Sequence, residues 1–351
     1  MNTKVISELK KLNLMIKKES DEHRKNKEKK EVTRNNFRTK YLNNVINIIE
    51  NLEYKLTLKN YIDLKEFDGV GKGSLDRVKQ ILEKGTLEET KDFKIDNKKD
   101  NAVEELMQVI GIGRSNAVDL FDKGATSIKK LRTMIKNNKI EVNDKIMLGL
   151  KYHGVFEVDI PRKEIDKVYK MFTKIIGNIN KEMELDDKNK FCFEICGSYR
   201  RRKTKSGDID ILLTKFGTKD NITDEKSSEY LSMFVNMLKK PVKYNNRKPF
   251  LVDDMTDKNI ITKYMGFSKY KDNPIRRIDV RFIPYTSYHS ALLYFTGSGE
   301  LNIKMRNIAK GMKFKLSEYG LFKSSGKKIK TKSEEDIFKK LGLDYIEPKF
   351  R

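Results

Sequence analysis

The amino-acid sequence predicts a multidomain α and α+β protein, with a helical amino-terminal half, a mixed β-sheet and a small α+β carboxy-terminal part. Between Phe37 and Lys84, apolar residues recur three and four positions apart, which is the spacing of a buried helix face. A short helical unit with a Gly-apolar-Gly turn occurs twice, about forty residues apart. After residue 160 the pattern changes to short apolar runs that are typical of strands. The length of 351 residues is enough for two or three domains.

Composition indicates a protein that binds a polyanion. Lysine and arginine outnumber aspartate and glutamate by 75 to 51, which gives a formal net charge of +24, and the excess is spread along the chain. Nucleic acid is the first candidate partner, although an AT-rich genome would also favour lysine and asparagine. No signal peptide is visible and no apolar run approaches ~18 residues, so we expect no membrane partner. We therefore expect an intracellular protein of the nucleus or cytoplasm, or of the viral factory or virion if the source is a virus.

The two cysteines and three histidines form no zinc-binding pattern. Cys192 and Cys196 lie in FCFEIC, which we expect to be a strand, and small apolar side chains of this kind suit a core better than a disulfide. Two free thiols fit a reducing compartment.

Two Gly-apolar-Gly turns, GVG at 69–71 and GIG at 111–113, each join the end of one helix to the start of another. Such a turn exposes backbone N–H groups beside a helix N-terminus, and these donors and the helix dipole together bind a phosphate oxygen. Glycine allows the close approach and a positive φ. No base is read, so the turn binds any sequence, and its carbonyl oxygens can hold a monovalent cation. The pattern resembles helix-hairpin-helix elements and predicts DNA-backbone binding by Gly69, Gly71, Gly111 and Gly113; a plain tight turn is the alternative.

Two aspartates lie one residue apart in the apolar run DIDILLT, and a third lies in RRIDVRF. Asp208 and Asp210 point to the same face of a strand, because side chains alternate with period two. If the two strands are neighbours, Asp279 joins them, and the three carboxylates repel one another and raise a pKa. Divalent cations relieve this repulsion, and two such ions can bind the attacking and leaving oxygens of a phosphoryl transfer. Surface acids on an edge strand are the alternative, which the apolar neighbours disfavour.

A glycine-serine pair precedes these acids by about ten residues, with a basic cluster between them. A strand that ends at Gly197-Ser198 offers N–H and hydroxyl donors to a triphosphate, and Arg201 and the turn at Ser206-Gly207 add further donors. Nearby lysine and arginine side chains neutralise a leaving pyrophosphate. The order of Gly-Ser, spacer, Asp-x-Asp and distant Asp predicts a nucleotidyltransferase palm that uses two Mg²⁺ or Mn²⁺ ions.

Three segments together resemble the family X DNA polymerases, with the layout of DNA polymerase beta: GSYRRRKTKSGDIDILLT, RRIDVRFIP and LLYFTGSGELNIKMR. The resemblance also includes both hairpin elements, the segment IPRKEI and the tail SEEDIFKKLGLDYIEPKFR, so it covers nearly the whole chain. It implies a lyase-like helical domain at 1–95, a second helix-hairpin-helix domain at 96–160, a palm at 161–285 and a nucleotide-selection domain at 286–351.

The resemblance implies a role for each matching residue. Asp208, Asp210 and Asp279 would be the metal ligands, and Asp279 would also accept the proton of the primer 3′-hydroxyl, directly or through solvent. Nucleotide contacts would come from Ser198, Arg201, Ser206 and Gly207 at the phosphates, from Tyr294, Phe295 and Gly297 at the sugar, and from Asn302 at the base. Arg306 would contact the templating strand, and Arg277 would pair with an active-site aspartate. Without the resemblance, Tyr294 and Phe295 would fit a helix face packed in the core.

Some positions depart from the family pattern. Gly299 stands where the family usually has aspartate, and Asp159 where it has a basic residue, so contacts to the incoming nucleotide are expected to be weaker. In DNA polymerase beta the amino-terminal domain also removes a 5′-deoxyribose phosphate through a lysine Schiff base, which arginine cannot form. The matching position here is Arg77. The remaining candidates for that lysine are Lys79, Lys72 and Lys84, and the domain would still bind a 5′-phosphate at a gap.

The first functional hypothesis is a template-directed polymerase that fills short gaps in DNA repair, such as base-excision repair. It would act as a monomer on gapped or primer–template DNA and use deoxynucleoside triphosphates (dNTPs). Template-independent terminal transfer is the second hypothesis; it needs a loop that blocks the template, and residues 245–275, better interpreted as a strand pair, are the only candidate. The third is a non-catalytic scaffold that binds DNA ends, which the loss of any of the three acids would favour.

Overall fold

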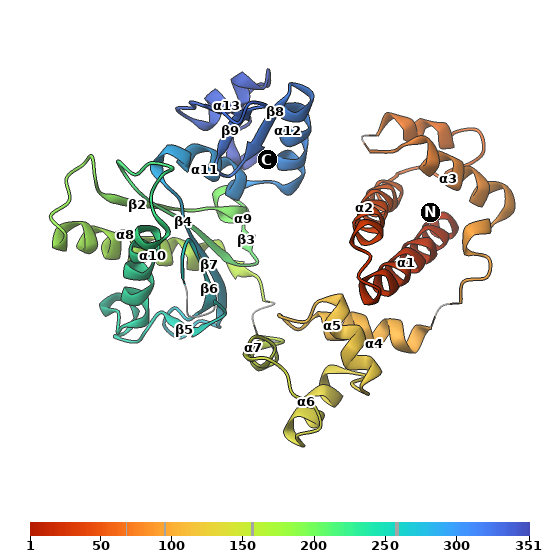
Figure 1. Ribbon diagram of the computed structural model, residues 1–351, viewed down its shortest axis with the longest axis horizontal. Coiled ribbons are helices and arrows are strands. Elements are labelled where there is room, and N and C mark those ends of the chain that lie inside the picture. The colour runs from red at the N-terminus through yellow and green to blue at the C-terminus, as the bar shows by residue number, and fades with distance from the viewer. Residues whose placement is uncertain (68, 95, 156–157, 257–259) are drawn as a thin grey trace. The chain divides into compact units, whose positions relative to one another are not determined.

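The computed structural model describes residues 1–67, 69–94, 96–155, 158–256 and 260–351. It forms two compact units, Met1–Leu150 and Lys151–Arg351, and each is described by itself (Figure 1). The predicted boundary between the first two segments falls at Ile95, outside the described residues, and the division into four segments stays a prediction. No described helix is long and apolar enough to cross a membrane.

The described part of the amino-terminal unit contains helices and no strand. Its α-helices are α1 (Thr3–Lys25), α2 (Lys29–Glu50), α3 (Lys72–Lys84), α4 (Asn97–Met107), α5 (Arg114–Asp122), α6 (Ile128–Lys136) and α7 (Asp144–Tyr152), and 3-10 turns lie at Tyr61–Glu66 and Glu88–Thr90. α1 buries Val5, Leu9, Leu12 and Ile16, a stripe at helical spacing, in a core shared with α2 and α3. A second, separate core lies among α4, α5, α6 and α7.

Five strands form a mixed sheet in the carboxy-terminal unit (Figure 1). They are β2 (Phe191–Ile195), β4 (Ile209–Lys215), β5 (Leu251–Asp254), β6 (Lys263–Ser268) and β7 (Arg276–Phe282). Their order is β2-β4-β7-β6-β5, and β4 pairs with β7 in parallel while the other neighbours are antiparallel. The predicted mixed sheet is therefore confirmed. So is the strand pair expected within 245–275, of which residues 257–259 lie outside the described part.

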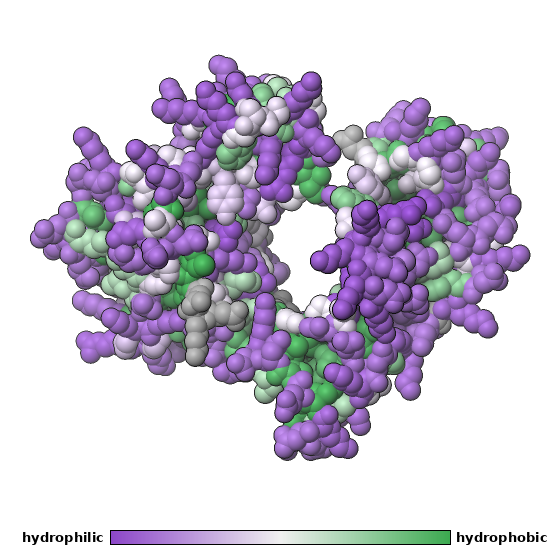
Figure 2. Space-filling model, in the orientation of Figure 1, coloured by the Kyte–Doolittle hydropathy of each residue, from purple (hydrophilic) through white to green (hydrophobic). Residues whose placement is uncertain are grey.

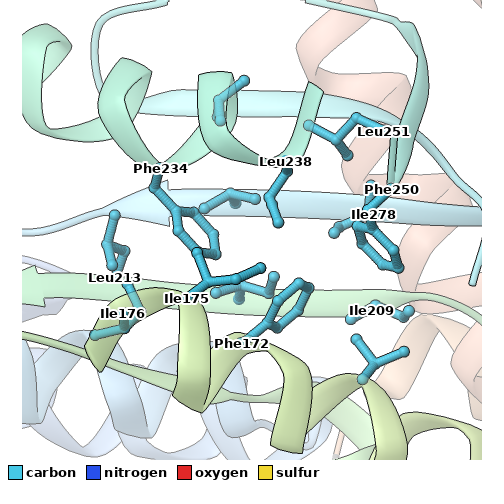
Figure 3. Close-up of a cluster of buried hydrophobic side chains, with 14 of the residues drawn as sticks. Phe172, Ile175, Ile176, Ile209, Leu213, Phe234, Leu238, Phe250, Leu251 and Ile278 are labelled. Carbon is cyan, nitrogen blue, oxygen red and sulfur yellow. The ribbon is translucent and has the colours of Figure 1, made fainter. Parts of the chain in front are cut away.

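Two helices, α8 (Arg162–Glu182) and α10 (Asp224–Lys239), cover one face of this sheet. Their apolar side chains share one core with those of β4 and β7, and the rings of Phe172 and Phe234 meet edge to face with centroids 5.6 Å apart (Figure 3). α8 continues past its predicted end near Ile176, because Ile179 extends the buried stripe by another turn.

A smaller α+β part completes the unit, as predicted. Three helices, α11 (Tyr288–Thr296), α12 (Gly299–Gly311) and α13 (Glu334–Lys340), accompany an antiparallel sheet of β8 (Phe314–Ser317), β9 (Gly320–Lys323) and β10 (Lys328–Ile329). α11 contacts β4, and Leu292 of α11 packs with Leu212 of β4 in a cluster separate from the α8 and α10 core. The visible surface of both units is dominated by hydrophilic residues (Figure 2), in line with a chain in which 36% of residues are charged.

Two local predictions are wrong. β2 ends at Ile195, and Gly197 begins a single helical turn, α9 (Gly197–Arg200), instead of ending a strand. β4 begins at Ile209, so Asp208 lies in the bend before the strand. The end of the basic cluster is held by a two-stranded ribbon, in which β3 (Lys205–Ser206) pairs with β1 (Ile160–Pro161).

A buried ion pair links α8 to strand β7 of the sheet. Arg276 of β7 donates from Nε and Nη2 to the two carboxylate oxygens of Glu164, at 3.0 and 2.8 Å. Its Nη1 donates to the carbonyl oxygen of Val158 at 2.8 Å. Both charged side chains are more than nine-tenths buried, so the loss of one partner would leave an unpaired charge in a site of low dielectric constant.

We expect Glu164→Gln to lower the free energy of unfolding of the carboxy-terminal unit by about 3–5 kcal/mol, because Arg276 would keep its charge without a counter-ion. Urea denaturation followed by circular dichroism measures this change. Glu229→Gln is the control, since it removes an exposed pair with Lys226 on α10 and is expected to have little effect. Equal effects of the two substitutions would contradict the prediction.

Candidate active site

The parallel pairing of β4 with β7 brings two of the predicted acids together. Asp210 and Asp279 are direct partners in the register. Their neighbours Ile209, Ile211 and Ile278 belong to the core under α8 and α10, so by the period of two both carboxylates point to the opposite face of the sheet. Asp208 lies beside them, one residue before β4.

An arginine connects the third acid to this pair. Nη2 of Arg277 lies 3.0 Å from Oδ2 of Asp208 and 3.3 Å from Oδ2 of Asp279. Among the described residues, no group of three or more histidine, cysteine, aspartate or glutamate side chains converges into a ready-made metal site. Two of the three carboxylates are instead paired with the Arg277 guanidinium.

The electrostatics of the acidic face favour an added cation. Burial, with the charges of Asp208 and Asp279 beside it, raises the pKa of Asp210 to about 7. Burial also raises the pKa of Asp279, against the lowering effect of Arg277. Oδ1 of Asp279 is buried and has no hydrogen-bond partner in the described part of the chain. The three carboxylates therefore fit a divalent ion, which would supply the missing positive charge.

The first residue of α9 must be glycine for Asp210 to lie where it does. Gly197 has φ +56°, and a Cβ built on it would lie 2.5 Å from Oδ2 of Asp210. The backbone N–H of Cys196 donates to the carbonyl oxygen of Asp210 at 2.8 Å, which holds β4 against the start of α9. The Gly-Ser pair thus lies directly beside the acids.

The residues predicted to contact the phosphates differ in their surroundings. Ser198 is part of α9, and Arg201, directly after it, donates from Nη1 to the carbonyl oxygen of Thr296 at 2.5 Å. A Cβ added to Gly297 would lie 3.1 Å from the same Nη1, so the structure brings Arg201 and Gly297 together. Ser206 is buried in β3, whereas Gly207 has open space around its Cα.

The aromatic residues of α11 share a cavity with the acids. Tyr294 and Phe295, in edge-to-face contact at 5.0 Å, line about 200 Å³ together with Asp210 and Asp279. Nδ2 of Asn302 donates to the carbonyl oxygen of Tyr294 at 2.8 Å. Phe295 also packs against the cluster that contains Leu212 and Leu292, so the alternative of a helix face packed in the core holds in part for this residue.

Arg306 lies at the edge of the same region. Its guanidinium is 4.8 Å from the centroid of the Tyr294 ring, and its Nη2 is 3.7 Å from Oε2 of Glu318. Sequence reasoning missed three charged residues that line the cavity: Glu318, Lys263 and Arg281. Arg281 could have been found, because it lies two residues after Asp279 and so shares its face. Lys263 and Glu318 carry no sequence signal, since only the fold brings them near.

The two glycine turns of the amino-terminal unit have the same backbone geometry. Gly69 and Gly111 have φ +85° and +93°, which favours glycine, while Gly71 and Gly113 are extended and precede the first residues of α3 and α5. A Cβ on Gly71 or Gly113 would meet nothing within 4 Å. The second glycine of each turn therefore leaves open space at a helix start, which suits close approach by a phosphate.

The sheet, the three acids and the helical turn beside them define the palm of a nucleotidyltransferase. Residues 159–285 match the family model described as DNA polymerase beta palm, and residues 291–351 match DNA polymerase beta thumb. The chain belongs to family X of the DNA polymerases, as the sequence resemblance indicated. Members of this family generally depend on divalent metal ions.

Curated relatives extend the similarity beyond the palm. DNA polymerase lambda of Arabidopsis thaliana is 28% identical over 317 residues, which are 84% of this chain and 55% of that protein. The Rattus norvegicus DNA polymerase lambda is 28% identical over 83% of this chain and 48% of its own length. DNA nucleotidylexotransferase of Xenopus laevis is 26% identical over 86% of this chain and 61% of its own length. The chain thus spans about half the length of the polymerase lambda relatives.

We expect Gly197→Ala to weaken Mn²⁺ binding by about tenfold. The new Cβ would displace the Asp210 carboxylate, and the left-handed backbone would cost about 1–2 kcal/mol. Electron paramagnetic resonance of free Mn²⁺ measures the affinity. Gly177→Ala in α8 is the matched control, because a Cβ there meets nothing within 4 Å. Unchanged Mn²⁺ affinity in a folded Gly197→Ala variant would show that Asp210 is not a ligand.

Proposed function

We propose that this protein is a template-directed DNA polymerase that extends a primer 3′-hydroxyl across short gaps in DNA. The observation that carries the proposal is the register pair of Asp210 and Asp279 beside the cavity lined by Tyr294 and Phe295. The carboxylates that would hold the metal ions then lie next to a cavity that would take the sugar of the nucleotide. The match to the polymerase beta palm and thumb supports the same activity.

In the proposed reaction, Asp208, Asp210 and Asp279 hold two Mg²⁺ or Mn²⁺ ions. When bound, such ions would supply positive charge for activation of the primer hydroxyl and for stabilisation of the leaving pyrophosphate. The buried Oδ1 of Asp279, which has no partner among the described residues, is free to accept the proton of that hydroxyl, directly or through solvent. Arg277 must release at least one carboxylate for the site to fill, since it holds both Asp208 and Asp279.

The nucleotide is bound by residues on two sides of the acids. Ser198, Arg201 and the Ser206-Gly207 turn bind the phosphates, and Tyr294, Phe295 and Gly297 line the sugar, where the close backbone excludes a ribose 2′-hydroxyl. Asn302, held by its bond to Tyr294, reaches the edge of the base, and Arg306 contacts the templating strand. Because Arg201 donates to Thr296, the phosphate and sugar contacts are linked.

The helical unit binds the DNA backbone through its two turns, Gly69–Gly71 and Gly111–Gly113. The backbone N–H groups at the open helix starts after Gly71 and Gly113 each donate to a phosphate oxygen, and the turn carbonyls hold a monovalent cation there. A net charge of +24 adds attraction to the DNA that does not depend on sequence. The enzyme acts as a monomer.

Template-independent transfer is the weaker candidate. A similar protein, at 26% identity, is named DNA nucleotidylexotransferase. The segment that would have to block the template instead forms the antiparallel strands β5 and β6 over its described residues. A scaffold without catalysis is also disfavoured, because all three acids are present and two of them are paired in register.

We expect Asp279→Ala to lower single-nucleotide extension on a one-nucleotide gap by at least about a thousandfold, because a metal ligand worth several kcal/mol is lost. Primer extension with Mg²⁺ or Mn²⁺ measures the rate. Asp187→Ala is the control, since that aspartate is exposed and pairs only with Lys190 in the structure described. The absence of extension by the unsubstituted protein with either metal would refute the proposal, and equal extension without a template would favour terminal transfer.

We propose further that the helical unit binds a gap 5′-phosphate without acting as a lyase. Arg77, which matches the Schiff-base lysine in the sequence resemblance, donates from Nε and Nη2 to Glu89 at 2.5 and 3.4 Å, and this pairing supports the proposal. Lys79 and Lys84 lie 3.7 and 3.3 Å from Glu83 and Glu88. Lys72, exposed at the start of α3, is the remaining candidate.

Borohydride trapping on a gap that carries a 5′-deoxyribose phosphate is therefore expected to give no adduct, while the same preparation extends the primer. Arginine cannot supply the deprotonated amine that attacks the sugar aldehyde. Separate Lys72→Ala, Lys79→Ala and Lys84→Ala variants serve as controls. An adduct in the unsubstituted protein that one of them abolishes would show that this lysine has taken the lyase role.

A further inference from the structure

The palm carries a groove that the proposed reaction does not use. The groove has a volume of about 530 Å³ and lies between α8 and α10 and the segment that follows α10. We call it the outer groove and describe it by six of its lining residues: Met183, Met233, Met237, Lys240, Lys243 and Tyr244.

The floor of the outer groove is apolar and adaptable. Met233 and Met237 are one helical turn apart on α10, and Met183 follows the end of α8. These methionines and Tyr244 pack against the main core of the palm but stay partly exposed. Methionine is flexible and polarisable, so a methionine floor can adjust to an apolar ligand.

The rim of the outer groove is mostly positive. Lys240 and Lys243 line the groove and are exposed, and Nζ of Lys174, outside the lining itself, lies 4.6 Å from the centroid of the Tyr244 ring. Glu182 is the acid among the lining residues. An apolar floor beside three lysines is complementary to a ligand with an apolar stripe and flanking negative charges.

The outer groove and the acids belong to opposite sides of the sheet. α8 and α10 share a core with Ile209, Ile211 and Ile278, whereas Asp210 and Asp279 point to the other face by the alternation along β4 and β7. A ligand bound in the groove would therefore leave the primer, the template and the nucleotide undisturbed.

We propose that the outer groove binds an acidic amphipathic helix of a partner protein and so recruits this protein to its place of action. A helix with apolar residues at i, i+3, i+4 and i+7 fills a groove between two helices, and acidic residues at its flanks meet the lysines of the rim. Duplex DNA offers the negative charge but no apolar stripe for the methionine floor. A fatty acid offers an apolar chain but only one charge for three lysines.

The test uses the full chain labelled with ¹³C on the methionine methyl groups, and a synthetic peptide of about five helical turns with a leucine stripe and glutamate elsewhere. We expect saturable shifts of the Met183, Met233 and Met237 signals. A peptide with lysine in place of glutamate is expected to bind at least about tenfold more weakly, since the rim would repel it. Gap filling is expected to proceed unchanged in the presence of the acidic peptide, and it reports on the polymerase proposal separately.

Two kinds of variant locate the binding. Met237→Glu should weaken binding of the acidic peptide by at least about tenfold, because a carboxylate replaces part of the apolar floor. Met147→Glu, at an exposed methionine of the amino-terminal unit, is the matched control. The double variant Lys240→Glu and Lys243→Glu changes only exposed rim residues, so it tests the charge requirement even if Met237→Glu fails to fold.

The proposal is overturned if the acidic peptide causes no shift, if both peptides bind equally, or if the rim variant binds the acidic peptide as well as the unsubstituted chain does. It is also overturned if dodecanoate or duplex DNA shifts the three methionine signals at concentrations at which the peptide does not.

Discussion

The parallel pairing of β4 with β7 is the contact on which the rest of the carboxy-terminal unit depends. Its register places Asp210 opposite Asp279, and the alternation of side chains sends Ile209, Ile211 and Ile278 into the core beneath. If the register between β4 and β7 slipped by one residue, the acids would be buried and the core side chains exposed. The same hydrogen bonds therefore fix the acidic face and the hydrophobic core. The acidic face is thus as well defined as the hydrophobic core that supports it.

Two neighbouring residues reduce the charge repulsion and the steric crowding among the carboxylates. Arg277 neutralises Asp208 and Asp279 in part, and Gly197 leaves room for Asp210. The helical turn that begins at Gly197 also carries Arg200, which donates to Glu334 of α13 and to Thr296 of α11. One short helix therefore contacts both the acids and the small α+β part, and this explains why so many predicted site residues cluster around it.

Much of the site could be predicted because its signals are local. The alternation in DIDILLT and RRIDVRF predicts that Asp210 and Asp279 point to one face of the sheet. The spacing of the glycines predicts the turns before α3 and α5. Contacts between distant segments carried no such signal. The pairing of Arg77 with Glu89 depends on the fold of the chain after α3, and Glu318 reaches the cavity from the turn between β8 and β9. Gly197 was predicted to end a strand, but it has a positive φ and is the first residue of α9. A Gly-Ser pair is common at both kinds of position, so its composition does not distinguish them.

Positive charge alone would not mark where the proposed DNA substrate binds this protein. Lys72 directly follows the turn at Gly69–Gly71 and Lys145 lies against Gly111, and lysines also line the outer groove of the palm. What differs is the accompanying chemistry. The turns offer open helix starts, whose N–H groups suit a phosphate, whereas the groove offers methionine and tyrosine, whose apolar surfaces gain nothing from one. The same charge excess can therefore attract DNA on one surface and an acidic protein segment on another, and it is the neighbouring groups that separate the two.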